Sequence, residues 1–349
     1  MSIFGDLIWK AKMFANEPYS SKFASHYHSP VLWREVADLF SGKTGVIFDA
    51  TLGGGGHSDA LLTTIEEIRI IGFDRDPEAI GAATERLARF GDRFVAVNSP
   101  FSVIGKELAR GDFDEFIGEA PIAGVLADLG VSSRQFDDPA RGFSIREGGP
   151  LDMRMSANDP TTAAELLELI DQDDLARLIA VNGERRFASR IAKLVKEALP
   201  ISSTAALVEV VEASIPKGYG HVRKGAVVAT FQALRIAVNR ELDELDLLLT
   251  FIDEELPVGS VAAIISYHSG EDERVKRAFR VAVEGNCTCP PRLPCVCGAT
   301  KRARYLLKRV MPRSDELKEN SRSRSARLRA IEITEEELVR PQMEFSRDT

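Results

Sequence analysis

Residues 49–57, Asp-Ala-Thr-Leu-Gly-Gly-Gly-Gly-His, carry the pattern in this chain that most directly implies chemistry. The apolar run Val46-Ile47-Phe48 leads into them and predicts a buried strand. Four consecutive glycines cannot continue a strand, but they permit a sharp turn into the helix expected from Ser58, and a ligand can approach their backbone closely. The N–H groups that open a helix favour a polar ligand at the same place. A strand, a glycine-rich turn and a helix N-terminus together predict a nucleotide-type cofactor site.

A second acidic residue supports this prediction. The run Ile68–Phe73 predicts the next strand, and Asp74 follows it at about 20 residues from the glycines, the spacing expected of an acid that binds ribose hydroxyls. A carboxylate at this position can accept hydrogen bonds from both hydroxyls of a ribose. The alternative for Asp74 is a solvent-facing loop residue beside a generic α/β turn.

The order of residues in the turn separates two cofactor classes. The dinucleotide motif G-x-G-x-x-G is absent, because His57 and Ser58 follow the glycines. The order Asp-x-x-x-Gly-x-Gly, formed by Asp49, Gly53 and Gly55, is similar to the first motif of S-adenosylmethionine-dependent methyltransferases. Beyond the shared strand, turn and helix, nothing supports a nicotinamide-dependent oxidoreductase.

Strand and helix patterns alternate along the chain and predict an α/β fold with a parallel sheet covered by helices on both faces. The predicted strands are Val46–Thr51, Ile68–Asp74, Phe94–Val97, Ile122–Asp128 and Val261–His268, followed by the closing strands Ala303–Met311 and Arg327–Ile333. Ligands bind beyond the carboxyl ends of the strands in such sheets. We therefore expect Asp49, Asp74, Phe101 and Asp128 to lie along one edge.

Residues 137–222 differ in pattern from the rest of the chain. They lack clear strand runs and contain helical patterns at 162–167, 175–181 and 186–199, which predicts a helical insertion in the α/β domain. One long helix, Thr230–Leu249, is expected before the sheet resumes.

The charge of the chain is unevenly distributed. Its 349 residues carry a net charge of −8, which argues against a generally basic nucleic-acid-binding protein. Residues 301–329 nevertheless hold 11 Lys or Arg and 3 Asp or Glu, a local charge of +8 that leaves −16 for the rest. This basic segment is either a phosphate-binding face or a solvated strand and tail. No run is long and apolar enough for a transmembrane helix, and no secretory signal is recognised, so we expect a cytoplasmic protein.

All four cysteines fall in one short segment, as Cys287, Cys289, Cys295 and Cys297 in the spacing C-x-C-x5-C-x-C. In a cytosolic protein such a cluster binds metal more often than it forms disulfides, and four thiolates suit zinc. The alternative is free thiols in a Pro-rich loop, because the pairs are closer than the usual C-x-x-C. The cluster lies outside the predicted site, in which we expect no metal.

Ordered motifs make the chain similar to the bacterial small-subunit (16S) ribosomal RNA (cytosine-N4)-methyltransferases, the MraW-like family. The resemblance covers about residues 28–333 and rests on several segments. They are His28–Leu32, Gly55–Ser58, Asp74–Pro77, Asp128–Ser133, Arg141–Ser144, Gly149–Met155, Gly183–Ala188, Phe231–Ile236, Ser266–Ser269 and Ser323–Ala326.

The resemblance implies a Rossmann-like S-adenosylmethionine-dependent methyltransferase domain, formed by residues 28–136 and 223–335, with an inserted helical substrate domain at 137–222. An N-terminal extension, 1–27, and a C-terminal tail, 336–349, flank these parts. The implied activity is transfer of a methyl group from S-adenosyl-L-methionine to the N4 amine of a cytidine in small ribosomal subunit RNA. The implied cofactor-binding residues are Gly55, Gly56 and His57 for the methionine part, Asp74 for the ribose, Phe101 for the adenine, and Asp128 and Gln135 completing the pocket.

The acceptor side of the reaction is less well defined by the sequence. No catalytic residue is assigned, although Asp128 or the backbone after it could accept a hydrogen bond from the amine. The unstacked base could be held by Phe143, Arg146 or Arg154 of the insert, although Phe143 fits a core residue equally well and is not assigned to the site. His268 follows a strand end, and we favour a loop-orienting role for it over that of a catalytic base.

One segment departs from the family pattern. Members often carry a His-Pro-Ala-x-Arg-like stretch where residues 225–230 read Gly-Ala-Val-Val-Ala-Thr, with Arg223 and Lys224 as the nearest basic residues. Two other functions therefore remain as alternatives. One is methylation of another RNA base or of a protein, and the other is a non-catalytic RNA-binding assembly factor. The intact Gly55-Gly56-His57 and Asp74 argue against the second, because a binder does not need a cofactor pocket.

Overall fold

A seven-stranded sheet forms the centre of the molecule, with strand order β3-β2-β1-β4-β5-β7-β6. The computed structural model describes residue 23 and residues 30–145, 148–290 and 295–339. The strands are β1 (Gly45–Asp49), β2 (Ile68–Phe73), β3 (Phe94–Val97), β4 (Ile122–Asp128), β5 (Val261–Ser266), β6 (Thr300–Val310) and β7 (Arg327–Leu338). β1 to β5 run parallel, whereas β7 lies antiparallel between β5 and β6. The predicted α/β fold is confirmed.

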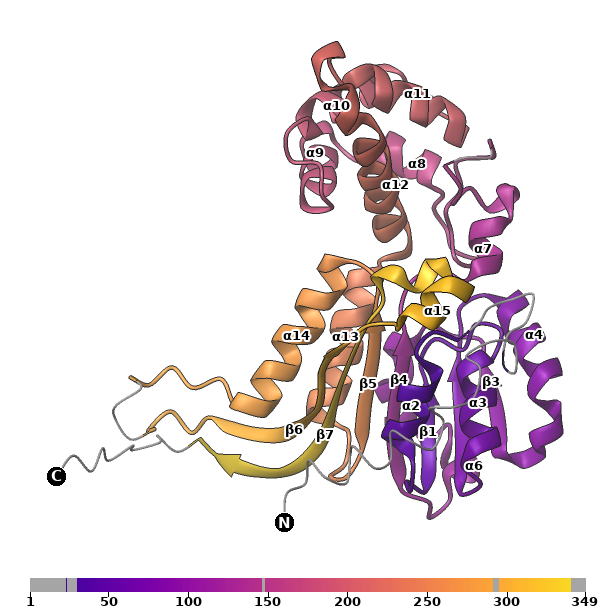
Figure 1. Ribbon diagram of the computed structural model, residues 1–349, viewed down its shortest axis with the longest axis vertical. Coiled ribbons are helices and arrows are strands. Elements are labelled where there is room, and N and C mark those ends of the chain that lie inside the picture. Colours follow the sequence, from indigo (N-terminus) through magenta and orange to yellow (C-terminus); the bar gives the residue numbers. More distant parts are fainter. Residues whose placement is uncertain (1–22, 24–29, 146–147, 291–294, 340–349) are drawn as a thin grey trace.

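Helices cover both faces of this sheet, as Figure 1 shows. On one face lie α2 (Trp33–Phe40), α3 (Gly56–Thr64) and α4 (Pro77–Leu87), and on the other α5 (Ile104–Ala109), α13 (Glu241–Glu254) and α14 (Ser269–Glu284). The central strands are apolar throughout because both of their faces are buried, and β1 and β5 have no exposed residue. Two shorter helices, α6 (Asp114–Ile117) and α15 (Ser314–Glu319), follow β3 and β6.

A separate helical lobe stands beyond the carboxyl edge of the sheet (Figure 1). It contains α8 (Ala163–Leu169), α9 (Gln172–Val181), α10 (Ala188–Glu197), α11 (Thr204–Ser214) and α12 (Arg223–Asn239). These helices bury a hydrophobic core of their own, to which α12 contributes Ala226, Val227, Phe231, Ala233 and Leu234. We therefore propose that the insert extends through α12, beyond the boundary at residue 222 that the sequence suggested.

The expected single helix Thr230–Leu249 is wrong, because the chain breaks between α12 and α13. Arg240 adopts a left-handed conformation with φ 52° and ψ 35° and ends the first helix. The side chain of Asn239 donates to the carbonyl oxygen of Met153 at 2.8 Å and accepts from the N–H of Met155 at 2.7 Å. These two bonds join the entry and the exit of the lobe at its base.

The C-terminal strands β6 and β7 form a long antiparallel pair that extends beyond the helices covering the sheet, as Figure 1 shows. The predicted tail 336–349 begins inside β7, which continues through Leu338, and the N–H of Val339 still donates to the carbonyl oxygen of Ala299 at 3.0 Å. Residues 340–349 lie outside the described part, as does the predicted extension 1–27 apart from Phe23. Phe23 is buried against Trp33, with ring centroids 5.0 Å apart. In the described residues no helix combines the length and apolar character needed to cross a bilayer.

The close approach of β4 and β5 gives a stability prediction. A Cβ on Gly124, which has φ +152°, would lie 1.9 Å from the carbonyl oxygen of Val261, whereas a Cβ on Gly81 in α4 would meet nothing within 4 Å. Gly124→Ala should therefore lower the free energy of unfolding by more than about 2 kcal/mol, or prevent folding. Gly81→Ala, the matched control, should raise it by about 0.5–1 kcal/mol. Urea unfolding of both variants measures the difference, and equal effects would contradict this packing.

Candidate active site

A cavity of about 390 Å³ opens at the carboxyl edge of the sheet, where the strand order changes direction between β1 and β4. Open α/β sheets bind their ligands at such a point, and the volume suits a nucleotide-sized molecule. Six of the seven residues that the sequence proposed as cofactor-binding line the cavity, namely Gly56, His57, Asp74, Phe101, Asp128 and Gln135. The seventh, Gly55, is not among the lining residues, although Gly53 and Gly54 are.

The glycine-rich turn is shaped by left-handed backbone. Gly53 has φ +50° and Gly55 has φ +75°, and Gly55 precedes α3 as its N-cap residue. A Cβ on Gly55 would press on Leu87 at 3.1 Å and on Ala83 at 3.3 Å, so a side chain there would disturb the packing against α4. Gly55 therefore allows the turn to pack against α4 and is not itself part of the cavity wall.

A buried carboxylate holds this turn from the end of β1. The hydroxyl of Ser58 donates to Oδ2 of Asp49 at 2.6 Å, and the N–H of Thr51 donates to Oδ1 at 3.2 Å. Burial raises the pKa of Asp49, while the hydrogen bond from Ser58 and the charge of His57 oppose the rise. Asp49 does not line the cavity, so its function is to fix the strand, turn and helix relative to one another.

Asp74, which follows β2, lies beside the glycine turn and lines the cavity with it. Its Oδ2 accepts from the N–H of Gly53 at 2.8 Å, and its Oδ1 accepts from the N–H of Asp76 at 2.8 Å. Burial raises the pKa of Asp74 to about 6, against the effect of these two N–H groups, and the charges of Asp76 and Asp49 raise it further. The carboxylate keeps lone pairs for hydroxyl donors, as the ribose prediction requires.

Asp128, at the end of β4, is held by the hydroxyl of Tyr267 and lies beside the imidazole of His57. The hydroxyl of Tyr267 donates to Oδ1 at 2.8 Å, and Nδ1 of His57 lies 3.7 Å from Oδ2. Nε2 of His57 is 2.9 Å from the carbonyl oxygen of Val31, so this nitrogen carries the hydrogen. The imidazole is therefore oriented by α2's preceding loop and presents Nδ1 to Asp128.

Gln135, in the short helix α7 (Ser133–Asp137), connects the cavity to the insert. Its Oε1 accepts from the N–H of Ser132 at 3.0 Å, and its Nε2 donates both to Oδ2 of Asp76 and to the carbonyl oxygen of Met155, each at 3.0 Å. Arg141 also donates to Oδ2 of Asp76, at 3.3 Å. Gln135 therefore orients the base of the insert against the cavity as well as lining it.

Phe101 begins a short 3₁₀ segment, Phe101–Val103, after β3. Its ring is half-buried. It packs against the hydrophobic core on the face of the sheet covered by α5, α13 and α14, and it also lines the cavity. The ring is thus both part of the hydrophobic core and an apolar wall of the cavity.

Sequence reasoning assigned no site role to several residues that also line the cavity. They include Arg75, Phe136, Arg235, Asn239, Glu241, Glu244, Tyr267, Glu271, Asn320 and Arg322. Their positions depend on pairings between distant segments, such as Arg75 with Asn239, 164 positions away, where the guanidinium donates to the carbonyl oxygen at 2.9 Å. The one local signal was Tyr267, which follows β5 as Asp128 follows β4. Five carboxylates and three guanidinium groups line the cavity, so its wall is net negative.

His268 orients the start of α14, as the favoured alternative predicted. Its Nδ1 accepts from the N–H groups of Gly270 at 3.2 Å and Glu271 at 3.4 Å. The N–H of Tyr267 donates to Oε2 of Glu271 at 2.8 Å, and this bond fixes the backbone of the tyrosine. Burial would raise the pKa of Glu271, but the hydrogen bond and charge of His268, with the charge of Arg235, outweigh it and lower the pKa.

A second cavity of about 170 Å³ adjoins the first and lies under the lobe. Val131, Phe136 and Arg235 border both cavities, and Phe143 and Phe231 line the smaller one. Of the residues suggested to hold a base, Phe143 borders this cavity but is only 5% exposed and belongs to the hydrophobic core of the lobe, as its alternative interpretation predicted. Arg146 lies outside the described residues. Arg154 is wrong for this role, because its guanidinium is occupied within its own loop. There it binds Asp152, with Nε and Oδ1 2.8 Å apart, and the carbonyl oxygens of residues 157 and 159.

Much of the positive charge of segment 301–329 is neutralised by acidic neighbours. Arg304 pairs with Glu332, Arg327 and Arg329 pair with Asp272, and Arg322 pairs with Asp137. Arg324 is exposed in the turn Ser321–Ser325, beside cavity residues Asn320 and Ser325. The segment is thus mostly an ion-paired surface, with Arg324 presented to solvent at the mouth of the cavity.

Comparison with known proteins gives consistent matches over nearly the whole chain. The model of the MraW methylase family matches residues 25–334. The chain is 45% identical over 315 residues to Ribosomal RNA small subunit methyltransferase H of Anaeromyxobacter dehalogenans, covering 88% of this chain and 98% of the relative. The proteins of the same name from Myxococcus xanthus and Geobacter sulfurreducens are 46% identical over 308 residues and 44% identical over 312 residues. The first alignment covers 87% of this chain and 97% of the relative, and the second covers 87% and 98%.

The environment of Asp74 predicts a pH-dependent affinity for S-adenosylmethionine. If Asp74 binds the ribose as the sequence predicts, the hydroxyls donate to the ionised carboxylate. Affinity should then be full above the pKa of about 6 and fall about tenfold for each pH unit below it. Asp74→Asn should weaken binding roughly ten- to a hundredfold at pH 7 and make it independent of pH from about 5 to 7. The control Glu78→Gln removes an exposed acid of α4 and should keep the wild-type profile. Calorimetric titrations measure this, and a flat wild-type profile would remove Asp74 from the site.

Proposed function

Because the chain belongs to the MraW methylase family, we propose that it transfers a methyl group from S-adenosyl-L-methionine to the exocyclic N4 amine of a cytidine in small-subunit (16S) ribosomal RNA. The relatives that it matches over nearly their full length are named as small-subunit ribosomal RNA methyltransferases. The observation that carries the proposal is one cavity at the strand-order reversal, with Asp74 and Asp128 on the strands to either side of β1. Because ribosomal RNA is the substrate, the cytoplasm is the expected location.

The residues present fit S-adenosylmethionine. The net negative wall of the cavity suits a ligand whose sulfonium and ammonium groups outweigh its single carboxylate. Gly53 and Gly54 let the ligand reach the backbone, Asp74 is placed to accept from the ribose hydroxyls, and Phe101 offers an apolar wall for the adenine. When bound, the cofactor supplies an electrophilic methyl group on its sulfonium sulfur.

The protein contributes positioning more than acid–base chemistry to this reaction. The N4 amine is a weak nucleophile because its lone pair is delocalised into the ring, and holding it in line with the methyl group gives a large part of the acceleration. Asp128, held by Tyr267 and lying beside His57, is the acceptor nearest the end of β4 and can take a hydrogen bond from the amine. A strong base is unnecessary, since the amine becomes acidic as it is methylated.

The smaller cavity is the proposed place for the target base. It shares Val131, Phe136 and Arg235 with the cofactor cavity, so a base inserted there would meet the methyl-donating end of the ligand. The exposed ring of Phe136 and the ring of Phe143 offer stacking surfaces for an unstacked cytosine. Val228, from the atypical stretch 225–230, lines this cavity, so that stretch contributes an apolar wall where the family pattern carries basic residues.

Two other functions remain distinguishable by experiment. A methyltransferase of another base or of a protein would use the same cofactor cavity but a different acceptor surface. An RNA-binding assembly factor without activity would have no need for the carboxylates gathered around the cofactor cavity.

The proposal is tested by incubating the purified protein with labelled S-adenosylmethionine and small ribosomal subunits that lack the modification. Nucleoside mass spectrometry should find N4-methylcytidine at a single position. Asp128→Ala should lose at least about a hundredfold in transfer rate, because both the amine acceptor and a partner for the cofactor's ammonium group are removed, while RNA affinity changes little. Label in another base would support the first alternative, and RNA binding without any label would support the assembly factor.

The exposed guanidinium of Arg324, beside cavity residues Asn320 and Ser325, gives a prediction about RNA binding. Arg324→Ala should weaken RNA binding and reduce the slope of log K against log salt by about 1, because one phosphate contact is lost. Arg304→Ala, which removes an arginine already paired with Glu332 in the same basic segment, should leave the slope near the wild-type value. Filter binding at several salt concentrations measures both slopes. Identical slopes for all three proteins would place Arg324 outside the RNA interface.

A further inference from the structure

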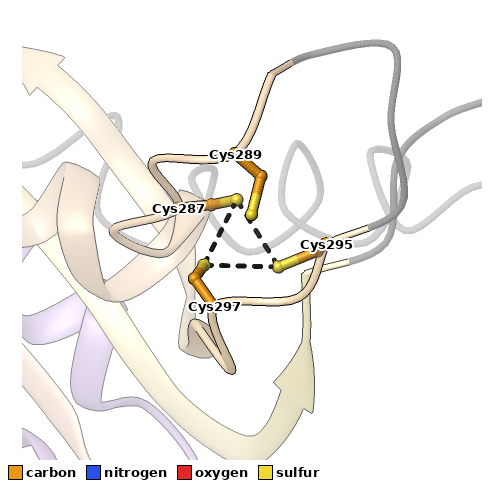
Figure 2. A group of neighbouring side chains, drawn as sticks. All are labelled: Cys287, Cys289, Cys295 and Cys297. Carbon is orange, nitrogen blue, oxygen red and sulfur yellow. Dashed lines mark hydrogen bonds between the residues drawn. The ribbon is translucent and has the colours of Figure 1, made fainter.

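The four cysteines converge in the link between α14 and β6, although residues 291–294 between the two pairs lie outside the described part. Cys287 and Cys289 follow the C-terminus of α14, and Cys295 and Cys297 precede β6. Figure 2 shows the four side chains turned toward one common centre, three of their sulfurs forming a triangle. This arrangement is independent of the cofactor cavity, because none of these residues lines it.

The distances between the sulfur atoms match those of a tetrahedral thiolate site. The Sγ atoms of Cys287 and Cys295 are 3.5 Å apart, those of Cys295 and Cys297 3.5 Å, and those of Cys287 and Cys297 3.7 Å. All four lie within 4.8 Å of one another. Zinc–sulfur bonds of about 2.3 Å in a tetrahedron place the sulfurs about 3.8 Å apart. Disulfide sulfurs lie only about 2.05 Å apart, so the geometry is that of four separate ligands.

The backbone supports the sulfurs in the way a metal site requires. The N–H of Val296, between the second pair of cysteines, donates to Sγ of Cys289 in the first pair at 3.4 Å. Such hydrogen bonds from outside the ligand set orient metal-bound thiolates and reduce their excess charge. The short C-x-C spacing, which made zinc less expected from sequence, still brings Cys295 and Cys297 within ligand distance. We propose that Cys287, Cys289, Cys295 and Cys297 bind one structural zinc ion.

The position of the cluster assigns it a role in the fold. α14 carries Glu271 near its start at the cofactor cavity and ends at Glu284 beside the cysteines, so the helix separates the two sites by about 20 Å. At the cluster the chain returns closely on itself, because a Cβ on Gly285 would meet the carbonyl oxygen of Thr300 at 3.1 Å. Bound zinc would hold the end of α14 against the start of β6 and so fix the end of the β6–β7 pair at which β6 begins. It would take no part in catalysis.

Metal content of the full-length protein tests the proposal directly. Protein purified without chelators should contain about one zinc per chain by plasma mass spectrometry. The apoprotein, reduced after chelator treatment, should bind Co²⁺ with the intense visible absorption and near-ultraviolet thiolate-to-cobalt bands of a tetrahedral thiolate site. Cys289→Ser and Cys297→Ser should each bind zinc at least about tenfold more weakly, whereas Val296→Ala, placed between two of the ligands, should bind it as the wild type does. The proposal is overturned if reduced wild-type protein binds no zinc, or if the serine variants bind it equally well.

A second measurement separates this site from the cofactor site and does not depend on the variants folding. Removing zinc from wild-type protein should lower its melting temperature and increase amide exchange in peptides covering residues 285–300. Affinity for S-adenosylmethionine should stay within about twofold, because the cavity is about 20 Å away along α14. Unchanged melting and exchange after removal of bound metal would overturn a clamping role. Failure of methyl transfer with intact zinc binding would instead contradict only the proposed function.

Discussion

The buried carboxylate of Asp49 is the interaction on which the site depends. A carboxylate in the interior is costly unless its oxygens are hydrogen-bonded, and here Ser58 and Thr51 supply the donors. Because Ser58 belongs to α3 and Asp49 ends β1, their bond holds the glycine turn in one conformation. The positions of Gly53, of the Asp74 carboxylate bonded to it, and of His57 all follow from that turn.

Several carboxylates lie close together at the site, although their burial and mutual repulsion lower the stability of the fold. Asp49, Asp74, Asp76 and Asp128 meet at one edge, and their burial and mutual repulsion raise the pKa values of Asp49 and Asp74. The protein offsets part of this cost with N–H donors and with the hydroxyl of Tyr267, and a positively charged ligand would offset more. The insert is attached to the same network, since Gln135 bonds to both Asp76 and Met155. The larger cavity and the base of the insert therefore share one set of supporting hydrogen bonds.

Sequence patterns predicted the sheet well because its central strands are continuous apolar runs that end in acids, and parallel strands must bring those ends together. They failed where the structure depends on contacts between distant segments. The break at Arg240 follows from the bonds of Asn239 to Met153 and Met155, and no local sequence pattern predicts it. The pairing of Asp128 with Tyr267 joins residues 139 positions apart. Cysteine spacing suggested a metal, but only the folded link shows four sulfurs around one centre.

We propose that the cavity between β1 and β4 holds S-adenosylmethionine with its ribose on Asp74 and its methyl-bearing sulfur toward Asp128. A crystal structure with S-adenosylhomocysteine would test this arrangement. We expect both ribose hydroxyls within about 3 Å of the Asp74 carboxylate, the adenine against Phe101, and the sulfur facing the smaller cavity lined by Phe143. A ligand seated elsewhere, or reversed so that the adenine lies toward Asp128, would contradict it.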